Sequence, residues 1–100
     1  LYTVMCQPDG GVVDDLLVYM RGADDYFLCF NAGNIAKDLA WMREQARGFA
    51  VTVTDRSADY AQLAIQGPRA AGLVQTLTAV PLDGIKYYHF AEGVVAGVPC

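Results

Sequence analysis

DGGVVDDLLVY, residues 9–19, places two glycines before an apolar run that contains two adjacent carboxylates. Gly10 and Gly11 allow a tight hairpin turn, and the Val, Leu and Tyr residues that follow favour a strand. Because side chains alternate across a strand, we expect Asp14 and Asp15 to point to opposite faces and not to form an acid–base pair. Both faces are apolar, which predicts an inner strand with at least one carboxylate drawn toward the interior.

Buried polarity marks this strand as the first candidate for function. A carboxylate is costly to bury unless it is paired or has a chemical task. Asn31 ends the predicted neighbouring strand and places an amide beside the same region. From these residues alone, a binding site at Asp14 and Asn31 and a purely structural role both stay open.

The composition of the chain excludes several classes of partner. Its 100 residues make one domain's worth of chain, and 54% of them are hydrophobic, which predicts a substantial core. The net charge of -4 disfavours nucleic acid and anionic membranes as partners. No signal peptide or membrane span is predicted, and both ends fall in apolar sequence, so we expect both to be truncated. The cysteines lack CxxC spacing, which predicts reduced core thiols and no metal site: Cys6, Cys29 and Cys100.

Turn and periodicity signals predict an α+β fold with a mainly antiparallel sheet and two helices. The first three strands are expected to form an antiparallel meander, because their connections are short. The predicted strands cover residues 1–7, the stretch after Gly11, and residues 26–31, 51–54, 60–66, 87–90 and 94–98.

The two predicted helices each carry an apolar stripe. Asn34 is expected to cap the first helix and Gly48 to stop it, with the stripe at Ile35, Leu39, Met42 and Ala46. Pro68 is expected at the first position of the second helix, whose buried stripe is Ala70, Leu73, Val74 and Leu77.

Other polar and aromatic residues do not build a second site. His89 is the single histidine and has no Ser or Cys partner in the pattern, so a hydrolase triad is poorly supported. Tyr87 and Tyr88 are expected to pack in a sheet. The Gly67-Pro68 turn does not fit a phosphate-binding loop.

Four stretches resemble the glycine cleavage system T-protein, an aminomethyltransferase. They occur in the order of that family, and together they cover nearly the whole chain: Tyr2, GGVVDDLLVY at 10–19, NAGNIAKD at 31–38 and AIQGP at 64–68. The resemblance implies that residues 1–100 are a partial N-terminal folate-binding domain, truncated at both ends, of a larger T-protein-like folate-binding fold. It also implies a cytoplasmic protein in bacteria, or a mitochondrial matrix protein if the source is eukaryotic.

The resemblance further implies a reaction and its residues. The T-protein takes the aminomethyl group from the dihydrolipoyl arm of the H-protein, transfers the one-carbon unit to tetrahydrofolate and releases ammonia. Asp14 falls on the catalytic carboxylate of the family, Asn31 on a partner of the pterin and Tyr2 on the pocket wall, while Asp15 is expected to be structural. This chain alone is expected to be inactive. A non-catalytic folate-binding scaffold, related to iron–sulfur assembly factors or folate-dependent demethylases, stays open as the alternative.

Overall fold

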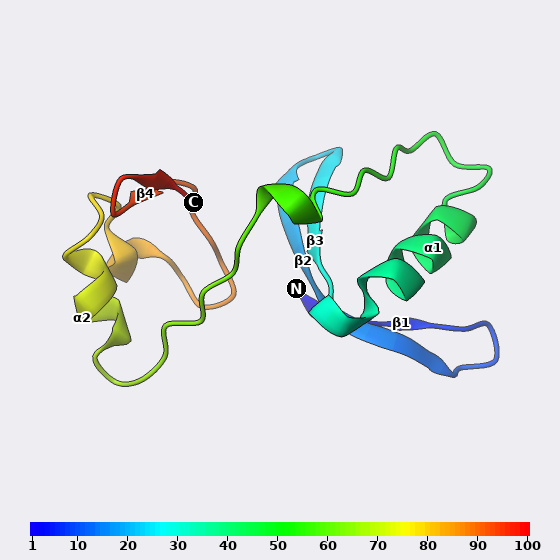
Figure 1. Ribbon diagram of the computed structural model, residues 1–100, viewed down its shortest axis with the longest axis horizontal. Coiled ribbons are helices and arrows are strands. Elements are labelled where there is room, and N and C mark those ends of the chain that lie inside the picture. Colours follow the sequence, from blue (N-terminus) through cyan, green and yellow to red (C-terminus); the bar gives the residue numbers. More distant parts are fainter. The chain divides into compact units, whose positions relative to one another are not determined.

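The computed structural model describes all 100 residues, which form two compact units, Leu1–Tyr60 and Ala61–Cys100. The first unit holds a sheet and a long helix, and the second holds a short helix and a hairpin (Figure 1). The predicted α+β class, with antiparallel strands and two helices, is confirmed. The strands form two separate antiparallel sheets, one of three strands and one of two.

Three strands of the first unit form the predicted antiparallel meander, in the order β1-β2-β3. They are β1 (Tyr2–Cys6), β2 (Val12–Gly22) and β3 (Asp25–Cys29). The inner position predicted for the Asp14 strand is therefore confirmed. Gly10 makes the β1–β2 turn possible, since its φ of 90° lies in the left-handed region that favours glycine.

Strand alternation decides which side chains the meander buries. Asp14 pairs with Met5 across the β1–β2 ladder, and Leu16 lies two residues further on the same face. These three side chains are all buried. One carboxylate does therefore point inward, as predicted, while Asp15 lies on the other face and is half-buried.

The first helix follows β3 through the 3₁₀ turn η1 (Ala32–Asn34) and runs as α1 (Ile35–Gln45). Its predicted stripe is confirmed as the less exposed face, because all four residues named for it are half-buried. Gly48 has a φ of 86° in the turn after the helix, which fits its predicted stopping role. The predicted cap is wrong in one respect: Asn34 occupies the N-cap position, but its side chain makes no capping hydrogen bond.

Two strands expected after α1 are absent. Residues 51–54 and 60–66 are irregular. Between them lies the 3₁₀ turn η2 (Ser57–Asp59). Residues 51–54 alternate as a strand should, but no neighbouring strand in the chain pairs with them. Without a hydrogen-bonding partner, alternation alone does not make a strand.

The second unit contains α2 (Ala70–Gln75), the 3₁₀ turn η3 (Leu82–Gly84) and a hairpin of β4 (Val94–Val95) and β5 (Val98–Pro99). Pro68 precedes the helix rather than opening it, because Arg69 is the N-cap. Residues 87–90 are not a strand, since Tyr88 has a φ of 58° and turns the chain. Within the predicted buried stripe of α2, Leu73 and Leu77 are exposed.

The buried apolar core is much smaller than the composition predicts. Met5 and Leu16 are the two buried hydrophobic residues of the chain. All three cysteines are free, as predicted, but Cys6 and Cys100 are exposed and so are not core thiols. Neither helix has the length and apolar character needed to cross a membrane.

Candidate functional site

Asp14 is the centre of a polar cluster where the chain passes from β3 into α1. Asp14 as a residue is 8% exposed and lies in the middle of the meander, on β2. The backbone N–H of Asp15 donates to Asp14 Oδ1 at 2.9 Å. A buried carboxylate needs such donors to replace the water that it loses.

Asn31 supplies the second donor and joins the two carboxylates of β2. Its Nδ2 lies 3.1 Å from Asp14 Oδ1, 3.1 Å from Asp15 Oδ1 and 3.1 Å from the Asp15 carbonyl oxygen. The alternation of the strand still separates the faces of Asp14 and Asp15, but both side chains reach one amide. None of the hydrogen bonds in the structure uses the carbonyl oxygen of the Asn31 side chain.

Asn34 supplies the third donor, at the other carboxylate oxygen. Its Nδ2 donates to Asp14 Oδ2 at 2.8 Å, shorter than the contact from Asn31. Asn34 therefore binds the carboxylate on β2 instead of capping its own helix. The hydrogen bond from Asn34 is the main cause that holds the pKa of the Asp14 carboxyl well below its usual range, and the Asp38 side chain lowers this pKa further. Asp14 is thus an anion at neutral pH.

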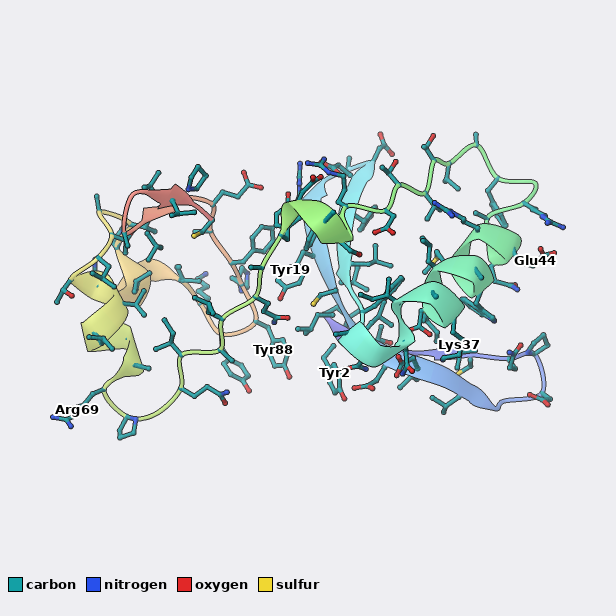
Figure 2. All side chains as sticks on the ribbon, viewed as in Figure 1. Tyr2, Tyr19, Lys37, Glu44, Arg69 and Tyr88 are labelled. Atoms are coloured by element: carbon teal, nitrogen blue, oxygen red, sulfur yellow. The ribbon has the colours of Figure 1, made fainter.

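The first turns of α1 carry two more charged groups into the cluster. Asp38 is fully buried, and Lys37 Nζ lies 2.8 Å from its Oδ1. Lys37 Nζ also donates to the backbone carbonyl of Val13, so that one ammonium group ties α1 to β2. Figure 2 shows Lys37 on the early part of α1. Burial raises the pKa of Asp38, and the neighbouring Asp14 raises it further, against the effect of Lys37.

Tyr2 is linked to the cluster through Asp15. Its hydroxyl donates to Asp15 Oδ2, and the residue is about half exposed. In the β1–β2 register Tyr2 pairs with Leu17, which places it on the face of Asp15 and not on that of Asp14. Of the three residues predicted for the site, Asp14 and Asn31 are in direct contact. Tyr2 is linked to them through Asp15.

Sequence reasoning missed three members of the cluster: Asn34, Lys37 and Asp38. A signal for them was present, because Asn31, Asn34 and Asp38 are spaced at i, i+3 and i+7. That spacing places polar side chains on one face of a helix and its leading turn. The same side of the helix carries the apolar stripe of α1. A polar side chain buried there is costly unless it has a hydrogen-bonding partner.

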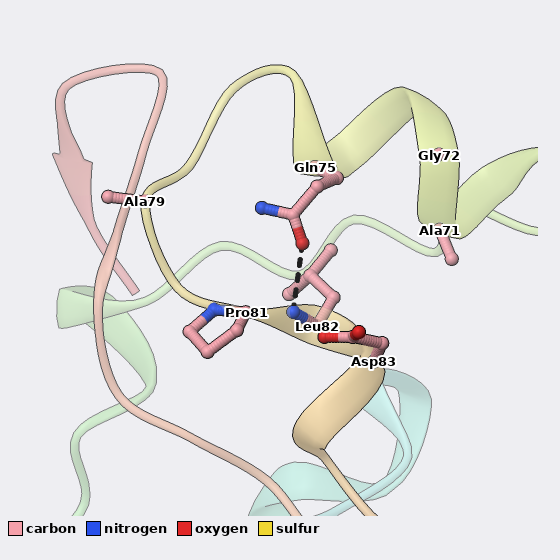
Figure 3. A pocket seen from close by; sticks show the side chains of 7 residues that line it. All are labelled: Ala71, Gly72, Gln75, Ala79, Pro81, Leu82 and Asp83. Atoms are coloured by element: carbon pink, nitrogen blue, oxygen red, sulfur yellow. Dashed lines mark hydrogen bonds between the residues drawn. The ribbon is translucent and has the colours of Figure 1, made fainter.

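A shallow pocket of about 470 Å³ lies in the second unit and is lined by none of the residues of this cluster. Gln75 closes one side of it by accepting a hydrogen bond from the backbone N–H of Leu82 at 2.9 Å (Figure 3). Asp83 is the one ionisable residue in its lining. The pocket therefore lacks the combination of charges seen around Asp14.

Comparison with known proteins shows what this chain is similar to. The family model of the GCVT N-terminal domain matches residues 1–100. An aminomethyltransferase of Moorella thermoacetica is 57% identical over 100 residues, which are 100% of this chain and 27% of that protein. One of Desulfitobacterium hafniense is 50% identical over 99 residues, covering 99% of this chain and 27% of the relative. One of Halalkalibacterium halodurans is 52% identical over 98 residues, covering 97% of this chain and 27% of the relative.

The chain thus spans about a quarter of the length of the curated relatives that it matches. The match nevertheless includes every residue of the cluster around Asp14, because it runs over the whole chain. The resemblance seen in the sequence is confirmed: the chain belongs to the GCVT N-terminal domain family, the family of the glycine cleavage system T-protein.

Proposed function

We propose that this chain is part of the N-terminal folate-binding domain of a tetrahydrofolate-dependent aminomethyltransferase, and that Asp14 is its catalytic carboxylate. The observation that carries the proposal is the state of Asp14: it is a buried anion that three amide N–H groups hold in one orientation. The relatives named aminomethyltransferase support the class of reaction.

A fixed buried anion suits the charge that this reaction develops. The donor is the aminomethyl group on the dihydrolipoyl arm of the H-protein, and cleavage of its C–S bond leaves positive charge on the departing carbon. A preorganised carboxylate in a site shielded from water stabilises such charge without having to reorient. Asp14 meets both conditions, since its partners are already in place and its side chain is buried.

The polar groups around Asp14 also fit tetrahydrofolate, whose amine nitrogens accept the one-carbon unit. A pterin presents several N–H donors, which require acceptors. The cluster offers the Asp14 carboxylate and the unused carbonyl oxygen of Asn31. Asn31 is held by its Nδ2 on both Asp14 and Asp15, so its carbonyl oxygen is fixed in position. Tyr2, anchored on Asp15, supplies an exposed aromatic ring at the edge of this site.

The experiment measures ammonia release by the full-length protein, with aminomethyl-loaded H-protein and tetrahydrofolate as substrates. We expect Asp14→Asn to lower turnover by about 100-fold, the scale for loss of one preorganised electrostatic group. Asp24→Asn is the matched control, because it removes the same charge at an exposed turn position. The proposal fails if the wild-type protein releases no ammonia, or if the two variants have the same turnover. Folate binding without ammonia release would favour the scaffold alternative.

A further inference from the structure

Asp38 is a buried acidic side chain that the proposed reaction does not use. It lies in the first turn of α1 and is completely inaccessible to solvent. Apart from the Lys37 ammonium group, no N–H or O–H group donates to either of its carboxylate oxygens. A buried carboxylate in this situation is strongly disfavoured as an anion.

Two charged groups face Asp38: Asp14, from β2, and Lys37, from its own helix. Asp38 lies beside Asp14, because Lys37 Nζ contacts both Asp38 Oδ1 and the carbonyl oxygen of Val13, and because each of the two carboxyl groups shifts the pKa of the other. Two carboxylates are both acceptors, so a hydrogen bond between them requires a proton on one of them. Asp14 already accepts from three amide N–H groups, which stabilise its anion, whereas Asp38 has no amide donor. The proton therefore belongs on Asp38.

We propose that Asp38 is a neutral carboxylic acid that donates its O–H to Asp14, and that it is the positioning residue which holds Asp14 as an oriented carboxylate. This inference rests on the proposed function in one respect, namely that Asp14 is the catalytic group. In this arrangement every oxygen of Asp14 has a fixed donor on the protein. The side of Asp14 that faces α1 is occupied by Asn34 and Asp38, which leaves the carboxylate in a single orientation.

Lys37 has a separate part in this arrangement. Its side chain is half-exposed, and its ammonium group contacts both Asp38 Oδ1 and the carbonyl oxygen of Val13. It can therefore be solvated and satisfied without an anion at Asp38. With Asp14 ionised and Asp38 neutral, Lys37 balances the one remaining negative charge of the pair.

The first test detects the proton directly in the full-length protein and needs no activity. Protein labelled with ¹³C at aspartate side chains is expected to show one protonated carboxyl signal at neutral pH. This signal should be absent from Asp38→Asn and present in the exposed control Asp24→Asn. It should also persist in Lys37→Met, because removal of an ammonium group favours the neutral acid further. If the wild-type protein lacks the signal, or if the signal persists in Asp38→Asn, the inference is overturned.

The second test separates a positioning role from a merely structural one. Asn at position 38 still donates a hydrogen bond to Asp14, so Asp38→Asn should keep turnover within a few-fold of wild type. Asp38→Ala removes the donor, and we expect turnover to fall by about tenfold or more. The acid limb of the pH–rate profile should move to higher pH in Asp38→Ala, because the pKa of Asp14 rises, and should stay in place in Asp38→Asn.

Equal loss in both variants would contradict the positioning role. If Asp38→Ala does not fold, the inference is still tested by two results: the loss of the protonated carboxyl signal in Asp38→Asn and the near-normal turnover of that variant. A protonated Asp38 in a protein that releases no ammonia would refute the proposed function alone.

Discussion

Replacing Asn34 with alanine in the full-length protein tests how Asp14 is kept ionised. The two carboxylate oxygens of Asp14 accept different numbers of amide hydrogen bonds. Oδ1 accepts from Asn31 and from the backbone N–H of Asp15, whereas Asn34 is the one amide that donates to Oδ2. Asn34→Ala should therefore perturb the carboxylate more than Asn31→Ala does. A hydrogen bond to a charged group is worth a factor of about 10 to 100 in an equilibrium or a rate. We expect a loss of that size in kcat/KM for ammonia release.

The pH dependence of this variant has a defined sign. The folded-state pKa of Asp14 is lowered chiefly by Asn34, so its loss should raise that pKa and shift the acid limb of the profile to higher pH. A lowered carboxyl pKa stabilises the fold above the unfolded-state pKa, and this contribution disappears as pH falls through the folded-state pKa. The difference in thermal stability between wild type and Asn34→Ala should thus be present at neutral pH and shrink in strong acid.

Asn34→Asp is the matched control, because it keeps the shape of the side chain but replaces the donor with an acceptor. It places a second carboxylate against Asp14 Oδ2 and should be at least as damaging as alanine. Neither variant removes a capping hydrogen bond, since the Asn34 side chain makes none. Helical content by circular dichroism should therefore be retained. An unchanged pH profile in Asn34→Ala would refute this account of Asp14, as would full activity in Asn34→Asp.

Four further outcomes are expected. Leu16→Ala should lower the free energy of unfolding by about 2–5 kcal/mol in denaturant melts, whereas Val12→Ala, at a site 65% exposed, should change it little. Gly10→Ala should cost about 1–2 kcal/mol in the same melts, because the φ of 90° is strained for any other residue; no loss would mean that the turn differs. In the ammonia assay, Asp15→Asn should reduce turnover far less than Asp14→Asn, and the reverse order would show that the wrong carboxylate has been assigned. Titration calorimetry of residues 1–100 with a tetrahydrofolate analogue should detect no tight binding, since this chain spans 27% of its relatives; micromolar affinity would contradict this.

The β1-β2-β3 meander could be predicted well because its signals are local. A glycine pair between two apolar runs predicts a hairpin whatever the rest of the chain does, and the observed register follows the alternation around Asp14. Residues 51–54 carry the same alternation, yet they are irregular, since a strand also needs a neighbour to accept its hydrogen bonds. The turn at Tyr88 could not be predicted either, because a positive φ at a tyrosine leaves no mark in the sequence.

The candidate site escaped prediction where residues depart from their usual local roles. Asn34 stands at an N-cap, where its side chain would normally bond its own helix, but it donates to a strand instead. Asp38 occupies the apolar face of α1, where an acidic side chain is costly, and Asp14 does the same on the buried face of β2. Each departure alone would be a defect. Together they satisfy one another, because each supplies the partner that another lacks, and such compensated departures are expected at functional sites rather than in cores.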